Sequence, residues 1–242
     1  MGELTRGDGI ALWRKVELAL LEDMKGLAPG SDRRLPTERE LVARFGVNRH
    51  TVRQALRALA EQGLVRTEQG RGTFAAHSPI AYPLGPRTRF TANLLALERV
   101  PSRRLRSLRL VPSSPSCAAA LGIPEGEAVI ELGALGLADG IPLMLTTIWF
   151  PLARFPDGVA RLGRDTSVTA FLASCGIHEY RRRSTHVTAR PASPEETRLL
   201  RQAKGSPVLV TVAVDVDPQD VPVSYAITSW ASEHVQLLVE DT

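Results

Sequence analysis

The sequence predicts a two-domain protein of the α+β class, and three observations support this prediction. Apolar residues recur with a helical period over residues 12–59 and alternate with a period of two over residues 64–76. The stretch HSPIAYPLGP, residues 77–86, holds three prolines and is predicted to be a linker. From residue 87 onward, short apolar runs alternate with helix candidates, as in an antiparallel sheet flanked by helices. The expected domains are therefore residues 1–76 and 87–242.

Helical signals open the first domain. In residues 12–24 the spacing i, i+4, i+7, i+8 gives one apolar face, made of Leu12, Val16, Ala19, Leu20 and Met24. Residues 26–34, with Pro29 and Gly30, interrupt the pattern. Thr37 and Glu40 then have the spacing of a capping box, so a second helix is expected to begin there. Gly46 fits its end, where a left-handed backbone favours glycine.

A third helix and a hairpin complete this domain. Asn48 is a suitable N-cap, and Gly63 ends a helix whose inner face is formed by Val52, Ala55, Leu56 and Leu59. The following run LVRTEQGRGTFAA alternates and turns at Gln69-Gly70-Arg71-Gly72, which predicts a small hairpin. Three helices closed by a hairpin, with a tight turn between the second and third, form a winged helix-turn-helix.

Ordered signals also mark the second domain. Apolar runs are found at residues 128–137, 143–151, 208–216 and 234–241, and helix candidates at 116–121, 166–175 and 194–203. Asp139-Gly140 between two of the runs is a hairpin turn signal. The segment from Asp217 to Pro222 separates another pair in the same way. One antiparallel sheet flanked by helices is expected.

The composition is that of an ordinary globular protein: 242 residues, 43% hydrophobic, 23% charged and a net charge of +4. The N-terminal MGELTRGDG has no apolar run of the kind found in signal peptides. No apolar run approaches the roughly 20 residues that span a bilayer. Cys117 and Cys175 are too few for a disulfide scaffold. A reduced, cytoplasmic protein without membrane contact is expected.

The charge is unevenly distributed along the chain. Residues 1–78 hold 13 Lys and Arg against 10 Asp and Glu, and residues 79–109 hold 7 against 1. Residues 110–242 hold 10 against 15. A basic first part and a mildly acidic second part indicate different partners, with an anionic polymer the candidate for the first.

The third helix has the pattern needed to enter a major groove of DNA. Its first residues are polar, and its apolar stripe keeps to the other side. In helix-turn-helix proteins these first residues meet the base edges, and an arginine can bond guanine O6 and N7 together. The second helix can hold a phosphate at its N-terminus. The Gly-Arg-Gly hairpin tip suits the minor groove. The predicted DNA-binding residues are Arg34, Thr37, Arg39, Asn48, Arg49, His50, Thr51, Arg53, Gln69, Gly70, Arg71 and Gly72.

The alternative for Arg49, Arg53 and Arg57 is an ordinary solvated helix face, which is common on isolated helices. The capped helix and glycine turn before this helix, and the hairpin after it, favour nucleic-acid binding. The run LPTERELVARFGVNRHTVRQALRALAEQGLVRTEQGRGTF resembles the winged helix-turn-helix of the GntR family of bacterial transcription regulators. That resemblance places Arg39, Arg49 and Arg53 where the family uses arginines on DNA, and Gly70 at the wing tip. GVNRHTVR and EQGRGTF are most similar to the phosphonate-utilisation (PhnF-type) regulators of the HutC branch.

The second domain resembles the UTRA effector-binding domain of the HutC branch, whose fold is shared with chorismate lyase. The resemblance is carried by GPRTRFTANL, ADGIPLMLTTIWFPLARFP, TSVTAFLASCGIHEYRRRSTHVTAR and SYAITSWASEHVQLLVE, which together span most of residues 85–240. It implies a small-molecule effector. The relatives that bind sugar phosphates have arginines just ahead of the A-D-G-x-P turn and an acidic residue near the C-terminal strand. This sequence has Ala134 and Gly136 ahead of the turn, which argues against a sugar phosphate, and it has Ser224 where the family usually has the acidic residue.

Arginine forks in this domain suit the oxygens of a phosphate or phosphonate. The predicted effector-binding residues are Arg87, Arg89, Phe90, Thr91, Ser167, Thr169, Tyr180, Arg183, Thr185, His186 and Tyr225. A solvent-facing strand edge is the alternative for Tyr180 to Ser184. Alternation puts Tyr180 and Arg182 on one face and Arg181 and Arg183 on the other, so at most one pair can face a pocket.

Taken together, the sequence predicts a homodimeric, sequence-specific DNA-binding regulator: a ligand-responsive repressor of phosphonate or phosphorus metabolism genes. Its partners are expected to be a palindromic operator in double-stranded DNA, a small anionic effector and a second copy of the chain. One alternative is a HutC-branch regulator that senses a different metabolite, and another is a DNA-tethered chorismate-lyase-like enzyme. A non-specific architectural DNA binder is a third. No cofactor, metal site or catalytic residue is expected.

Overall fold

The computed structural model describes residues 11–25, 34–68, 72–75, 79–87, 89–164 and 167–239. The chain forms two compact units, Met1–Ser78 and Pro79–Thr242, and each is described by itself. None of the described helices is long and apolar enough to cross a membrane.

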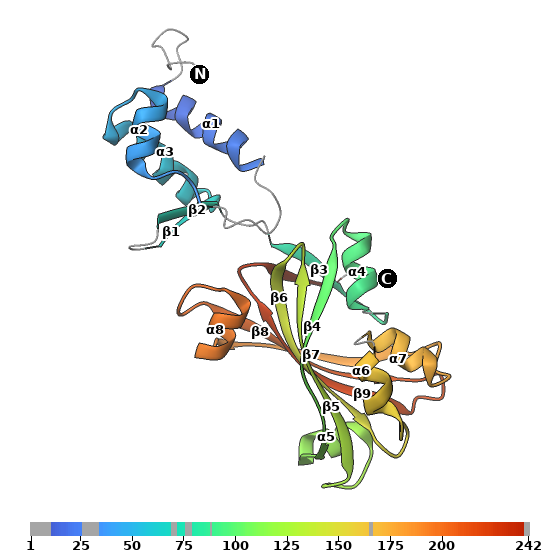
Figure 1. Ribbon diagram of the computed structural model, residues 1–242. Helices are drawn as coiled ribbons and strands as arrows, with labels where there is room; N and C mark the ends of the chain where they lie inside the picture. Colours follow the sequence, from blue (N-terminus) through green and yellow to red (C-terminus); the bar gives the residue numbers. More distant parts are fainter. Residues whose placement is uncertain are drawn as a thin grey trace. The chain divides into compact units, whose positions relative to one another are not determined.

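The described part of the first unit contains three helices and a two-stranded antiparallel hairpin (Figure 1). The helices are α1 (Leu12–Lys25), α2 (Glu38–Phe45) and α3 (Arg49–Glu61), and the strands are β1 (Val65–Glu68) and β2 (Gly72–Ala75). Their apolar faces meet in one core, in which Val16, Leu20, Leu41, Val52 and Leu59 are completely buried. The predicted winged helix-turn-helix is confirmed.

Local chemistry fixes the turn between α2 and α3. The backbone N–H of Thr37 donates to the Glu40 carboxylate at 2.7 Å, and the Glu40 N–H donates to the Thr37 hydroxyl at 3.3 Å, so the predicted capping box is present. Gly46 ends α2 with a φ of 63°, where an L side chain would be strained. The Asn48 side chain accepts from the Thr51 N–H at 2.8 Å and starts α3.

The second unit is built on a six-stranded antiparallel sheet of order β4-β5-β6-β9-β8-β7, as Figure 1 shows. Its strands are β4 (Pro101–Pro112), β5 (Ala128–Ala138), β6 (Ile141–Pro151), β7 (Arg181–Pro191), β8 (Pro207–Val216) and β9 (Pro222–Ala231). The helices around it are α4 (Phe90–Ala96), α5 (Pro115–Leu121), α6 (Gly158–Arg164), α7 (Val168–Ser174) and α8 (Pro194–Leu200). The predicted antiparallel sheet flanked by helices is confirmed.

The period of two along β6 gives the sheet two different faces. Met144, Ile148 and Phe150 point to the face covered by α4, α6 and α7. Leu145 and Trp149 point to the other face, where α8 and α5 pack. Figure 1 shows α8 on the opposite side of the sheet from α6 and α7.

Five residues of the segment predicted as a linker, residues 77–86, form a strand. Ile80–Leu84 form β3, which pairs in parallel with β10 (Val235–Val239). Tyr82 anchors this strand, because its side chain is only 1% exposed and packs 4.6 Å from the Trp230 ring. Pro83 is tolerated because a strand at a sheet edge needs fewer N–H donors than a central one. The three prolines predicted an irregular segment, but burial of the Tyr82 side chain stabilises a strand there.

Candidate functional site

The outer face of α3 presents two arginines. Arg49 and Arg53 lie one helical turn apart, with side chains 69% and 58% exposed. Val52, Ala55 and Leu59 are fully buried and hold the opposite face of the helix against the core. The first turn and a half of α3 therefore shows long, forked hydrogen-bond donors to solvent.

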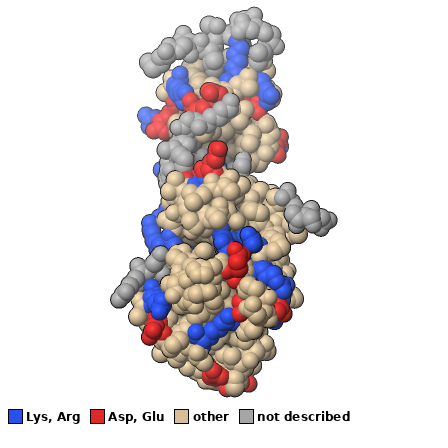
Figure 2. All heavy atoms as spheres, turned by 90° about the vertical axis from the view of Figure 1, so that its right-hand side faces the viewer, with Lys and Arg blue, Asp and Glu red and all other residues tan. Residues whose placement is uncertain are grey.

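A single carboxylate holds both arginines. Glu38, in the first turn of α2, accepts from the Nε of Arg49 at 2.7 Å and from the Nε of Arg53 at 3.0 Å. The Arg49 hydrogen bond is the main reason why the pKa of Glu38 lies below its usual value, and Arg53 adds to the effect. Arg57, one turn further on, pairs instead with Glu61 at 2.9 Å. On the face of the molecule that Figure 2 presents, acidic and basic side chains are likewise interspersed.

The structure places the other predicted DNA-binding residues around this face with different roles. Arg39 and His50 are exposed, on α2 and α3 respectively. Thr37 donates both its N–H and its hydroxyl to Glu40, and the Thr51 hydroxyl donates to Asn48. At the N-terminus of α2, the Glu40 carboxylate thus already occupies the Thr37 N–H, and Glu38 adds a second negative charge that disfavours a phosphate there.

The hairpin is described only in part. Gln69, Gly70 and Arg71, the predicted wing tip, lie outside the described residues. Gly72 has a φ of 118°, and a Cβ at this position would lie 3.0 Å from the Nε of Arg34. Arg34 therefore packs against the base of the hairpin, and its backbone forms an isolated bridge with Phe74.

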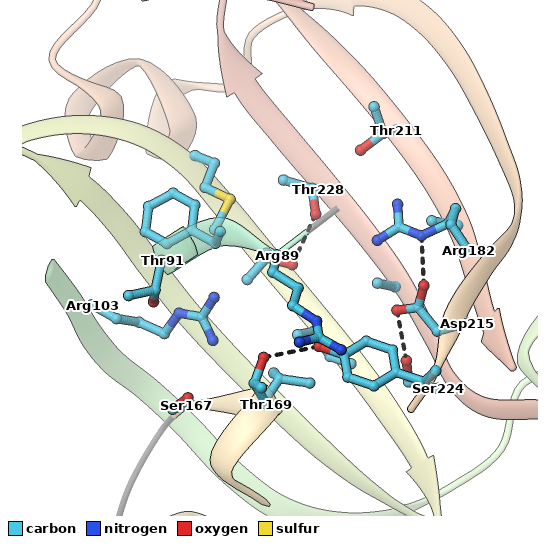
Figure 3. A pocket seen from close by; sticks show the side chains of 18 of the residues that line it. Arg89, Thr91, Arg103, Ser167, Thr169, Arg182, Thr211, Asp215, Ser224 and Thr228 are labelled. Atoms are coloured by element: carbon cyan, nitrogen blue, oxygen red, sulfur yellow. Dashed lines mark hydrogen bonds and ion pairs between the residues drawn. The ribbon is translucent and has the colours of Figure 1, made fainter. Parts of the chain in front are cut away.

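A pocket lies on the sheet face that α4 and α7 cover (Figure 3). Alternate residues of β6, β8 and β9 form its floor, and the segments around α4, α7 and the start of β7 form its walls. Its lining contains Tyr82, Arg89, Phe90, Thr91, Arg103, Met144, Thr146, Ile148, Ser167, Val168, Thr169, Tyr180, Arg182, Thr211, Ala213, Asp215, Ser224, Ala226, Thr228 and Trp230.

Arg89 is the cation that this pocket leaves without a hydrogen-bond acceptor. Its Nε and one Nη are buried, and nothing in the described part of the chain accepts a hydrogen bond from them. The guanidinium lies 4.9 Å from the centre of the Tyr180 ring, whose hydroxyl is 2.9 Å from that of Thr169. A buried donor without an acceptor costs about 1–3 kcal/mol, and more when it is charged. An anion in the pocket would relieve this cost.

A second arginine in the pocket is already neutralised. The Nε of Arg182 donates to Asp215 at 2.6 Å, and the Ser224 hydroxyl donates to the other oxygen of the same carboxylate at 3.2 Å. Asp215 and Ser224 are direct cross-strand partners on β8 and β9. Arg182 and Ser224 thus hold the two oxygens of the Asp215 carboxylate.

The lining as a whole is positive. It contains three arginines, Arg89, Arg103 and Arg182, against the one carboxylate of Asp215. Figure 3 shows Arg89 and Arg103 pointing into the same part of the pocket, with the Arg182–Asp215 pair to one side. Asp215 neutralises only one of these guanidinium groups, so the lining has a net positive charge. Hydroxyl groups of Thr91, Ser167 and Thr169 lie beside them.

Six of the eleven predicted effector residues line this pocket: Arg89, Phe90, Thr91, Ser167, Thr169 and Tyr180. The other five do not. Arg87 is exposed and pairs with Glu179 at 2.9 Å, and Arg183 pairs with Asp220 at 3.0 Å. Tyr225 follows Ser224 on β9 and so points to the opposite face of the sheet, where it stacks on Trp149.

A bulge in β7 turns His186 away from the sheet face that lines the pocket and leaves Thr185 at the margin of that face. The register of β7 against β8 shifts between Arg182 and Ser184, so alternation does not continue regularly along β7. Thr185 only touches the pocket wall, 3.4 Å from an Nη of Arg182, and His186 is exposed. Of the two pairs that alternation distinguished, Tyr180 and Arg182 form the one that lines the pocket.

The polar residues of the floor were not predicted. Thr146, Thr211, Asp215 and Thr228 come from three different strands, and the side chains of Thr146 and Thr228 lie 2.8 Å apart. One signal was available for Thr211 and Asp215, which are polar residues within the apolar run of residues 208–216. The meeting of all four residues in space depends on the register of the sheet, which no local pattern shows.

Comparison with known proteins identifies the class to which this two-unit architecture belongs. The model of the bacterial regulatory proteins of the gntR family matches residues 13–75, and the UTRA domain model matches residues 96–236. The chain therefore belongs to the GntR family of bacterial transcription regulators, in the branch that carries a UTRA domain. It is a transcription regulator and not an enzyme.

Particular relatives narrow this placement. The chain is 39% identical over 233 residues to an uncharacterized HTH-type transcriptional regulator of Rhizobium meliloti (strain 1021), covering 96% of each chain. It is 35% identical over 215 residues to the probable transcriptional regulator PhnF of Escherichia coli (strain K12), covering 85% of this chain and 86% of that one. The crystal structure of PhnF from Mycobacterium smegmatis superposes with a TM-score of 0.62 at 25% identity, covering 94% of this chain and 99% of that chain. The chain is of the PhnF type.

Proposed function

We propose that this regulator is a cytoplasmic homodimeric repressor that binds a palindromic operator through α3. Its affinity for the operator rises or falls when a small anion fills the pocket. One α3 helix reads few base pairs, so two copies on two half-sites are needed for both affinity and site length. The exposed Arg49 and Arg53 are the groups on α3 that suit guanine edges.

The ligand that we propose is a phosphonate or a phosphate ester. The observation that carries this proposal is the buried guanidinium of Arg89, whose donors lack acceptors among the described residues. The lining holds three arginines and one carboxylate, and its net positive charge suits a phosphoryl group, which carries close to two negative charges near neutral pH. The similarity to two proteins named PhnF supports the same ligand class.

Selection of bound DNA from a random pool tests the DNA-binding half of the proposal. We expect enrichment of one palindrome whose half-sites lie about one helical turn, or a multiple of it, apart. Enrichment of no sequence over the starting pool would contradict operator recognition.

Thermal melting of the full chain with inorganic phosphate and with methylphosphonate tests the ligand half. A ligand that binds the folded state raises the melting temperature as its concentration rises above Kd. If neither anion shifts the melting temperature while an uncharged metabolite does, the proposed ligand class is wrong and the regulator senses something else.

A further inference from the structure

We propose that Glu38 is a positioning residue for DNA recognition, which holds Arg49 and Arg53 by their Nε groups so that their terminal nitrogens face the DNA. This inference rests on the proposal that these two arginines read base edges. It assigns a role to a carboxylate on a surface that is proposed to bind the negatively charged DNA.

The geometry is that of one acceptor shared by two forks. Arg49 Nε lies 2.7 Å from Oε2 of Glu38, and Arg53 Nε lies 3.0 Å from Oε1 and 3.1 Å from Oε2. The two arginines are four residues apart on α3 and therefore lie on the same face of the helix. Glu38 comes from α2, so the contact also ties the two helices of the motif together at their outer surface.

The atoms that Glu38 uses leave the recognition atoms available. A guanidinium has five N–H donors, one on Nε and four on the two Nη nitrogens. Glu38 engages the Nε of both arginines, and the Nη pair is a planar fork that can bond guanine O6 and N7 together. Since a long side chain loses rotamer freedom when it binds, an arginine already oriented in the free protein loses less.

Two other roles for Glu38 predict different results. As an electrostatic repellent of phosphates, it would weaken binding to every DNA sequence equally. As a negative charge near the N-terminus of α2, it would stabilise the helix without affecting sequence discrimination. The ratio of operator affinity to affinity for unrelated DNA distinguishes a positioning residue from both.

The experiment compares wild type, Glu38→Ala and Glu38→Gln on the operator selected by the wild-type chain and on a scrambled duplex of equal length and composition. Glu61→Ala is the matched control, because it removes the carboxylate partner of Arg57 on the same helix. We expect Glu38→Ala to lower the operator-to-scrambled ratio by about 5-fold or more. Affinity for the scrambled duplex should stay equal or rise, since a negative charge is lost near the phosphates. Glu38→Gln keeps an oxygen acceptor and should lose less, and Glu61→Ala should leave the ratio unchanged.

A double-mutant cycle with Arg49→Ala and Arg53→Ala completes the test. If Glu38 acts through these arginines, its substitution should change the ratio less in either background than in wild type. Three results would overturn the positioning role. The first is that Glu38→Ala does not lower the operator-to-scrambled ratio, and the second is that it lowers the ratio in both arginine variants by the same factor as in wild type. The third is that Glu38→Gln lowers the ratio as much as Glu38→Ala does. Melting curves of each variant show that the first unit is folded. If Arg49→Ala and Arg53→Ala themselves leave operator affinity unchanged, the base-reading proposal fails instead.

Discussion

At the scale of single residues, the outward direction of Arg49 and Arg53 follows from the helical period of α3. Each lies on the face opposite Val52, Ala55 and Leu59, which are fully buried. An arginine that bonds guanine O6 and N7 together contributes about 1–3 kcal/mol of discrimination.

Replacing either arginine by alanine should therefore weaken operator binding by about 1–3 kcal/mol, with a smaller loss on scrambled DNA. Titration of labelled operator and scrambled duplexes measures both losses. Arg198→Ala, an exposed arginine on α8 in the second unit, is the control for removal of one positive charge. If Arg198→Ala weakens operator binding as much as the two α3 variants do, α3 does not read the bases.

Arg89 makes the corresponding prediction for the pocket. Arg89→Met keeps an unbranched side chain against Tyr180 and removes the buried donors that lack acceptors. The ligand-free protein should melt at the wild-type temperature or higher, because leaving those donors without acceptors costs free energy. The melting-temperature rise with methylphosphonate should disappear.

Arg87→Met is the matched control for Arg89→Met. Arg87 lies two residues earlier, is 70% exposed and pairs with Glu179 outside the pocket. This variant should keep the full response to methylphosphonate. A response retained by Arg89→Met, or lost equally in both variants, would show that the pocket does not hold the anion through Arg89.

At the scale of elements, an ion pair joins the capped start of α8 to β7, which is an edge strand of the sheet. Arg190 of β7 donates two hydrogen bonds of 2.7 Å to Glu196, which also closes a capping box with Ser193. These contacts, the Arg190 hydrogen bonds first among them, lower the pKa of Glu196 from 4.5 to about 2. A carboxyl group whose folded-state pKa is depressed stabilises the fold above its unfolded pKa, and this contribution is lost as the pH falls through the folded value.

The free energy of unfolding should therefore depend on pH through Glu196. Urea unfolding at pH 6 should show wild type more stable than Glu196→Gln, and the difference should shrink at pH 3, inside the window from 4.5 to about 2. Glu195→Gln, which removes an exposed partner of Arg106, is the control and should show little change at either pH. An equal difference between wild type and Glu196→Gln at both pH values would contradict this role.

Local signals predicted most elements but not all of them. The caps at Thr37 and Asn48 and the left-handed Gly46 are short-range features, and the bounds of α2 and α3 follow from them. Strand β4 has basic and exposed residues because it lies at the edge of the sheet, so it lacks the apolar run of a central strand. Strand β3 is hidden among prolines, and its partner β10 lies at the other end of the chain.

The lining of the pocket could likewise be predicted only in part, because it depends on residues that are far apart in the sequence. Arg89, Thr91 and Thr169 were predicted from the chemistry of an anion site. Asp215 and Arg182 pair only because β7 and β8 are neighbours, with a bulge that adjusts their register. Which of two adjacent residues faces a pocket is set by strand register and bulges, and the sequence does not show either.

At the scale of the whole molecule, the proposed function requires that ligand binding in the pocket changes the affinity of α3 for DNA. A ligand changes DNA affinity only if it binds the DNA-competent and DNA-incompetent states with different affinity, and typical coupling is about 1–3 kcal/mol, or 5- to 150-fold. The GntR and UTRA matches place the two activities in separate units of one chain. In the proposed homodimer, this coupling would act by changing the spacing between two α3 helices.

The most direct test of this account is the affinity of the wild-type chain for its selected operator, measured with and without saturating methylphosphonate. The account predicts a change of at least about 5-fold in Kd, with no comparable change on scrambled DNA. An operator Kd that stays the same while methylphosphonate is shown to be bound would contradict it.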